Sequence, residues 1–140
     1  MTTLTNLERQ HHDIYEVLNK TKALINTTNL EDSGLEIAKN ISILAGKLKI
    51  HLNNEDKYLY PALLKKGDSA LQVKTEKYIN EMGHLSKTYM SFKDKYNTRS
   101  KILASPQAFI KEANEVFEAV FERMHREDSD LYVQAKEHVH

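Results

Sequence analysis

The chain has 140 residues, the size of one domain that can bury its own apolar core. It contains no cysteine, which excludes disulfides, thiolate metal sites and cysteine nucleophiles and leaves histidine and carboxylate side chains as the strong metal ligands. Lysine plus arginine equals aspartate plus glutamate at 20 each, so no net field attracts nucleic acid or an anionic membrane. We expect one domain over residues 1–140, with neither nucleic acid nor membrane as a partner.

The sequence favours a nearly all-helical, cytoplasmic protein. The N-terminal residues show no basic region followed by an apolar run, and no later segment approaches the roughly 20 apolar residues of a membrane span. Only four glycines and two prolines occur, whereas leucine, lysine, glutamate and alanine are frequent.

The first predicted helix begins at Thr5, because Thr5 and Glu8 have the spacing of a capping box, and it ends in the polar run 26–29. Its apolar stripe has one gap at the spacing of three to four residues, and His11 fills that gap. His12 points about 100° away, onto a wetter face. His11 is therefore predicted to face the interior.

The second predicted helix starts near 32–33 and ends at Gly67, which suits a left-handed C-cap. Pro61 should kink its last turn or end the regular helix early. His51 and Glu55 are four residues apart on the inner face, one turn above the other. A buried ionised carboxylate costs several kcal/mol unless it is paired or coordinated, so the pair is either a hydrogen-bonded core contact or half of a metal site.

The third predicted helix runs from 68–69 to Tyr96, and a linker is expected over 97–105. Glu81 lies at the inner edge of its apolar stripe, and His84 lies farther round in polar surroundings.

The fourth predicted helix begins with Ser105 as N-cap and Pro106 as first helical residue. Its apolar stripe requires an inward residue at Glu127, while His125 lies on a flanking row.

Four long helices with short connections predict an antiparallel up-down-up-down four-helix bundle. In such a bundle Glu55, Glu81 and Glu127 each lie about 10 to 12 residues from the same end, and His11 lies at that end as well. Three carboxylates at one level repel one another unless a cation is present. This favours a metal site over a hydrogen-bonded core.

One alternative arrangement of such a metal site is that of ferritin-like di-iron proteins, which use Glu-x-x-His on two helices. The chain contains Glu81-x-x-His84 and Glu122-x-x-His125. These pairs fall on consecutive helices, and Glu122 faces away from the apolar stripe, so the sequence disfavours this plan.

The motif HxxxExxxLYPxL over residues 51–63, together with the run 11–18, resembles the hemerythrin-like (HHE cation-binding) domain. The similarity covers nearly the whole chain and includes the runs 81–83 and 126–132. It implies a left-handed four-helix bundle that holds two non-heme irons, bridged by carboxylates and an oxo or hydroxo group. His11 and the His-Glu pair of the second helix match the family's ligands.

Two positions depart from the family pattern. The family's fourth helix usually repeats His-x-x-x-Glu, whereas Arg123 stands at the histidine position before Glu127, with His125 two residues off. The third helix usually supplies histidine, whereas the stripe favours Glu81, with His84 three residues later. The chain resembles a carboxylate-richer branch, and its anionic ligands favour the ferric state over reversible oxygen carriage.

The predicted iron ligands are His11, His51, Glu55, Glu81 and Glu127, with His84 and His125 as further candidates. Among the tyrosines, Tyr89 is expected nearest the metals. The expected function is to bind or sense dioxygen, nitric oxide or peroxide. Two alternatives stay open: a di-iron enzyme or iron donor, acting in peroxide breakdown or repair of iron centres, and a metal-free interaction bundle.

Overall fold

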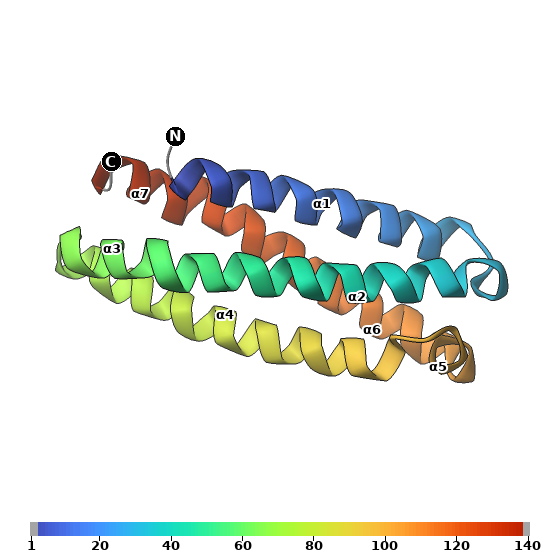
Figure 1. The fold of residues 1–140 in the computed structure, drawn as a ribbon. Coiled ribbons are helices and arrows are strands. Elements are labelled where there is room, and N and C mark those ends of the chain that lie inside the picture. The colour runs from blue at the N-terminus through green and yellow to red at the C-terminus, as the bar shows by residue number, and fades with distance from the viewer. Residues whose placement is uncertain (1–2, 139–140) are drawn as a thin grey trace.

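The computed structural model describes residues 3–138, which are helical almost throughout (Figure 1). The elements are α1 (Thr3–Thr27), α2 (Leu30–Asn54), η1 (Glu55–Leu59), α3 (Tyr60–Lys66), α4 (Ser69–Tyr96), α5 (Arg99–Ala104), α6 (Pro106–Arg126), η2 (Glu127–Leu131) and α7 (Tyr132–His138), of which η1 and η2 are π-helical turns. The prediction of an all-α fold is confirmed. No helix in the described part of the chain is both long and apolar enough to cross a membrane.

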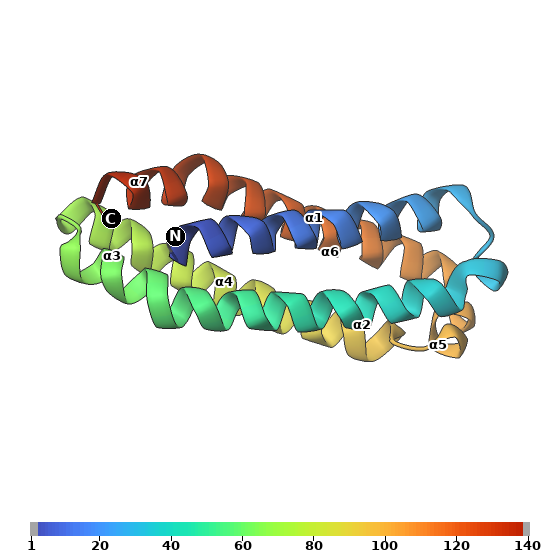
Figure 2. The ribbon, with the colours of Figure 1, turned by 45° about the horizontal axis from the view of Figure 1, so that its top comes forward.

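Four long helical segments lie side by side along one axis (Figures 1 and 2). They are α1, then α2 continued by η1 and α3, then α4, and finally α6 continued by η2 and α7. The chain reverses direction from each segment to the next. One end of the bundle holds the first turns of α1 together with α3 and α7, and the other end holds α5.

Side-chain caps define several helix starts. Asp68 accepts a hydrogen bond from the amide of Leu71 at 2.9 Å and begins α4, and Pro106 is the first residue of α6, both as predicted. The N-cap of α2 is Asn29, which accepts from the amide of Glu31 at 2.8 Å, so α2 begins before the predicted position.

The predicted linker 97–105 contains the short helix α5. Thr98 caps this helix by accepting from the amide of Lys101 at 3.2 Å, and Ile102 is fully buried. One apolar side chain docked on the core thus orders a segment whose composition indicated a loop.

The expected left-handed cap at Gly67 is wrong, because its φ of −78° and ψ of 158° are extended. The reason for glycine is close approach instead. A Cβ atom at Gly67 would lie 2.6 Å from the carbonyl oxygen of Leu63 and 2.8 Å from Cδ2 of Leu71.

A polar layer divides the apolar core into two clusters. On α1, Leu7 belongs to the smaller cluster and Ile14 to the larger one, with the buried His11 between them. The same change of cluster occurs around Glu55 on the second segment and around Glu127 on the fourth. Three segments therefore bring polar side chains into the core at one level.

The helix α4 crosses this layer without an inward polar side chain. Tyr78 belongs to the smaller cluster and Met82, one turn later, to the larger one, and both are buried. This leaves no stripe position between them, so Glu81 falls at the edge of the helix.

Both π-helical turns begin at a glutamate of the polar layer. The backbone carbonyl of Glu55 accepts from the amide of Tyr60, and that of Glu127 accepts from the amide of Tyr132. Residues five apart in an α-helix are about 140° apart around the axis, whereas the i to i+5 bond of a π turn brings them near one face. Pro61 follows η1 and has no counterpart after η2. The π turns thus turn both tyrosines toward the polar layer.

We predict that Gly67→Ala destabilises the protein by about 1 kcal/mol or more, because the added methyl overlaps a carbonyl oxygen. Gly46→Ala is the matched control: its Cβ meets nothing within 4 Å inside α2, so about 0.5–1 kcal/mol of stabilisation is expected. Denaturant unfolding of both variants measures the two effects. Equal stability of the two variants would contradict the close-approach explanation.

Candidate metal centre

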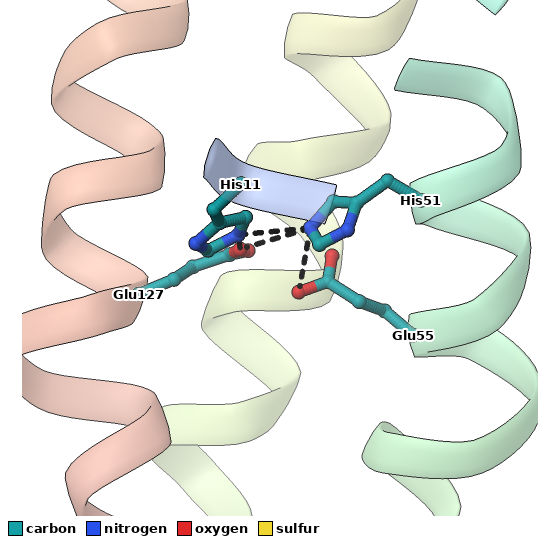
Figure 3. Close-up of side chains that lie close together, drawn as sticks. All are labelled: His11, His51, Glu55 and Glu127. Atoms are coloured by element: carbon teal, nitrogen blue, oxygen red, sulfur yellow. Dashed lines mark hydrogen bonds and ion pairs between the residues drawn. The ribbon is translucent and has the colours of Figure 1, made fainter. Parts of the chain in front are cut away.

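Four buried side chains from three helical segments point toward one another (Figure 3). They are His11 of α1, His51 of α2, Glu55 of η1 and Glu127 of η2. One ligand-type atom of each lies within 4.8 Å of the others, and none of the four residues is more than 1% exposed. We call these four residues the inner cluster.

Short contacts join the members of the inner cluster. The Nε2 atom of His11 lies 2.8 Å from Oε1 of Glu127, and the Nε2 atoms of His11 and His51 are 2.9 Å apart. Nε2 of His51 lies 3.4 Å from Oε2 of Glu55 and 3.4 Å from Oε1 of Glu127. Two imidazole nitrogens and two carboxylate oxygens therefore face one small space.

Hydrogen bonds on their outer sides orient both imidazoles. The Nδ1–H group of His11 donates to Asp128 at 2.6 Å, and Asp128 also accepts from the hydroxyl of Tyr15 at 3.1 Å. The Nδ1–H group of His51 donates to Oε1 of Gln10 at 2.9 Å. A neutral imidazole that donates through Nδ1 carries its lone pair on Nε2. In their neutral forms both imidazoles would thus turn a lone pair toward the inner space, as in histidines that bind a metal.

The two histidines have raised pKa values. Burial alone would lower the pKa of His51, but the charge of Glu55 and hydrogen bonds with Glu127 and Glu55 raise it to about 9. Burial also opposes protonation of His11, yet hydrogen bonds with Asp128 and Glu127 raise its pKa. Positive charge is therefore favoured in the inner cluster.

The two glutamates have opposite pKa shifts. Burial and the nearby charge of Glu127 raise the pKa of Glu55. Burial favours the neutral form of Glu127 as well, but hydrogen bonds from both histidines and the charge of Arg123 hold its pKa well below the usual range. A metal cation would compensate the same carboxylates and accept the same imidazole lone pairs.

The hydroxyl of Tyr132 lies inside the inner cluster. It donates to Oε2 of Glu55 at 2.8 Å, and its oxygen is 3.1 Å from Nε2 of His11 and 3.4 Å from both Nε2 of His51 and Oε1 of Glu127. Its ring stacks on His11 with a centroid distance of 4.8 Å. Burial and the charges of the two glutamates raise the pKa of this phenol, which keeps its proton in the cluster.

Tyr89 does not reach the inner cluster, although the sequence led us to expect it nearest the metals. Its hydroxyl donates to the backbone carbonyl of Ile41 at 2.8 Å, within the larger apolar cluster. The tyrosines that reach the inner cluster are Tyr60 and Tyr132, which the π turns position.

Three of the predicted ligands lie outside the inner cluster. The side chain of Glu81 is 34% exposed and accepts from Nη1 of Arg126 at 2.9 Å. His84 and His125 are exposed, and the ring of His125 stacks on Phe121. Their helical register explains this placement, since none of the three falls on a buried stripe. The Glu-x-x-His pairs of the ferritin-like plan therefore do not meet in the interior.

Sequence reasoning missed the residues that support the inner cluster. The signal for two of them was the repeated sequence Glu-Asp-x-x-Leu-Tyr at 55–60 and 127–132, which contains Asp128 and Tyr132. For Gln10, beside the inward His11, the sequence carried no distinguishing signal.

The inner cluster fits a metal cation. Its donors are imidazole nitrogen and carboxylate oxygen, which together suit iron, manganese or zinc. The orienting hydrogen bonds and the two inward lone pairs supply the remaining features of a prepared site.

The family model for the hemerythrin HHE cation-binding domain matches residues 2–135. No curated protein matches the chain significantly. No solved structure does so either.

We predict a pH profile for the metal-free protein. The pKa of His51 rises from 6.5 to about 9 on folding, so its stabilising contribution is complete below pH 6.5 and is lost as the pH rises through about 9. The pKa of Glu127 falls below 4.5, so its contribution is present above pH 4.5 and is lost in more acidic solution. Both contributions are present between about pH 4.5 and 6.5, so thermal melts of chelator-treated protein should show stability that falls as the pH rises from this window toward 9. The raised pKa of Glu55 adds to that fall.

The control for this profile is His51→Ala, which should show a smaller decline in stability between pH 6.5 and 9, because the raised pKa of His11 remains. If stability falls as steeply between pH 6.5 and 9 in that variant as in the unchanged protein, groups other than His51 cause the fall.

Proposed function

The chain belongs to the hemerythrin HHE cation-binding domain family, and from this we propose that it is a non-heme iron protein that binds a small exogenous ligand. The observation that carries the proposal is the convergence of His11, His51, Glu55 and Glu127 within 4.8 Å in the core. Family membership also supports a left-handed up-down-up-down arrangement of the four long segments.

Iron is the metal that we propose. The family and the mixed nitrogen and oxygen donors support this choice, since histidine with carboxylate and open positions is typical of non-heme iron. Bound iron would supply an open coordination position for dioxygen, nitric oxide or peroxide.

The chain's own residues would prepare that position. Asp128 and Gln10 hold the two imidazoles with Nε2 inward, which raises their basicity as ligands. Tyr132 places its hydroxyl beside the ligand atoms, where the hydroxyl can donate its hydrogen bond to a bound small molecule in place of Oε2 of Glu55. The apolar clusters above and below exclude bulk water from the layer. These features support binding or sensing of a small oxidant or gas.

The test of metal binding compares two neighbouring histidines. His11→Ala removes an inward ligand and should abolish stoichiometric loading with ferrous iron under anaerobic conditions. His12→Ala, which changes an exposed side chain on the same turn, should load as the unchanged protein does. Iron analysis after desalting gives the result. Equal loading of both variants would contradict the site.

Bound iron should also stabilise the fold. At a free iron concentration 100-fold above its dissociation constant, the gain is about 2.7 kcal/mol, a rise in melting temperature of several degrees. After oxidation, near-ultraviolet charge-transfer absorption should change on addition of azide or nitric oxide. A melting shift without any spectral response would indicate a closed structural site and would contradict the ligand-binding role.

A further inference from the structure

We infer that each chain binds one iron, because the guanidinium of Arg123 takes the place of a second cation between the two carboxylates. The inference rests on the proposed function, since it concerns the number of metals at the same site. It departs from the pair of irons that the family resemblance implies.

The two glutamates divide their oxygens between two sides. Oε1 of Glu127 and Oε2 of Glu55 contact the imidazole nitrogens of the inner cluster. Their other two oxygens, Oε2 of Glu127 and Oε1 of Glu55, contact neither histidine and point to different partners. We call these two atoms the outer oxygens. In a site with two metals, the second cation would bind between such oxygens.

Arg123 and Tyr60 already join the outer oxygens. Nε of Arg123 donates to Oε2 of Glu127 at 2.9 Å, and its Nη2 donates to the hydroxyl of Tyr60 at 3.2 Å. The hydroxyl of Tyr60 donates to Oε1 of Glu55 at 3.1 Å. A continuous chain of hydrogen bonds therefore runs from one glutamate to the other through a cationic group.

Further contacts fix the guanidinium in this position. Nη2 of Arg123 donates to the backbone carbonyl of Tyr78 at 2.8 Å, and its Cζ lies 4.6 Å from the centroid of the Tyr78 ring. The residue is only 4% exposed. A carboxylate, a carbonyl and an aromatic face thus hold the Arg123 side chain in one position beside the inner cluster.

The charges also favour one divalent cation over two. Glu55 and Glu127 carry two negative charges, of which Arg123 compensates one within the hydrogen-bonded chain. One divalent ion adds two positive charges, and a second would place five positive charges against two carboxylates. Like charges in a buried site repel strongly, so the guanidinium disfavours a second metal.

Glu81 lies near enough to Arg123 to act as a ligand in a site with two irons. Its Oε2 lies 3.8 Å from Nη1 of Arg123 and is shared with Arg126. Arg123→His would remove the cation, create the His-x-x-x-Glu spacing of the family pattern before Glu127, and free Oε2 of Glu127 from its direct partner. That histidine, Glu81 and Oε2 of Glu127 could then bind a second iron, joined by Oε1 of Glu55 once the hydroxyl of Tyr60 turns away from it.

The test is anaerobic titration with ferrous iron, followed by oxidation and electron paramagnetic resonance. The unchanged protein should bind one iron per chain and give the signal of an isolated high-spin ferric ion. Two irons per chain with a silent, coupled ferric pair would overturn the inference. No bound iron at all would instead refute the proposed function, so the two failures differ.

The variants test the role of the guanidinium. Arg123→His should bind about twice as much iron as the unchanged protein and lose most of the isolated ferric signal on oxidation. Arg123→Lys keeps a cation and should stay at one iron per chain, which provides the control if the histidine variant folds poorly. A lysine variant that binds two irons would overturn the role assigned to Arg123, as would a folded histidine variant that still binds one.

Discussion

The constraint on which this structure depends is the burial of two carboxylates, Glu55 and Glu127, at one level of an apolar core. Each buried charge costs several kcal/mol unless it is compensated. The surrounding side chains provide that compensation as hydrogen-bond donors or cations, namely His11, His51, Tyr60, Arg123 and Tyr132. The division of the core into two clusters follows from the same layer.

Helical periodicity predicted much of this layer. His11, His51, Glu55 and Glu127 each fill a gap in an apolar stripe, so their inward direction follows from 3.6 residues per turn. The same reasoning failed for Glu81 because Tyr78 and Met82 already occupy the inward positions of α4 on both sides of the layer. A residue at the edge of a stripe can turn either way, and its partner Arg126 holds Glu81 outward.

The residues that sequence reasoning missed depend on departures from that period. Tyr132 reaches the layer only because η2 changes the register by a π turn, and Tyr60 does so through η1. The position of Arg123 in the family pattern was evident, but its direction was not, because arginine on a helix usually reaches solvent. Its burial follows from three fixed contacts with Glu127, Tyr60 and Tyr78. Thus the side chains of the inner cluster could be predicted, whereas the groups that set their charge could not.

Anomalous diffraction at the iron edge from crystals of iron-loaded protein tests the central claim most directly. It locates each metal independently of any assumed number. The account predicts one peak per chain, bounded by the Nε2 atoms of His11 and His51 and by Glu55 and Glu127, with the guanidinium of Arg123 still on the outer oxygens. Two peaks within the layer, or a single peak beside Glu81, His84 or His125, would contradict it.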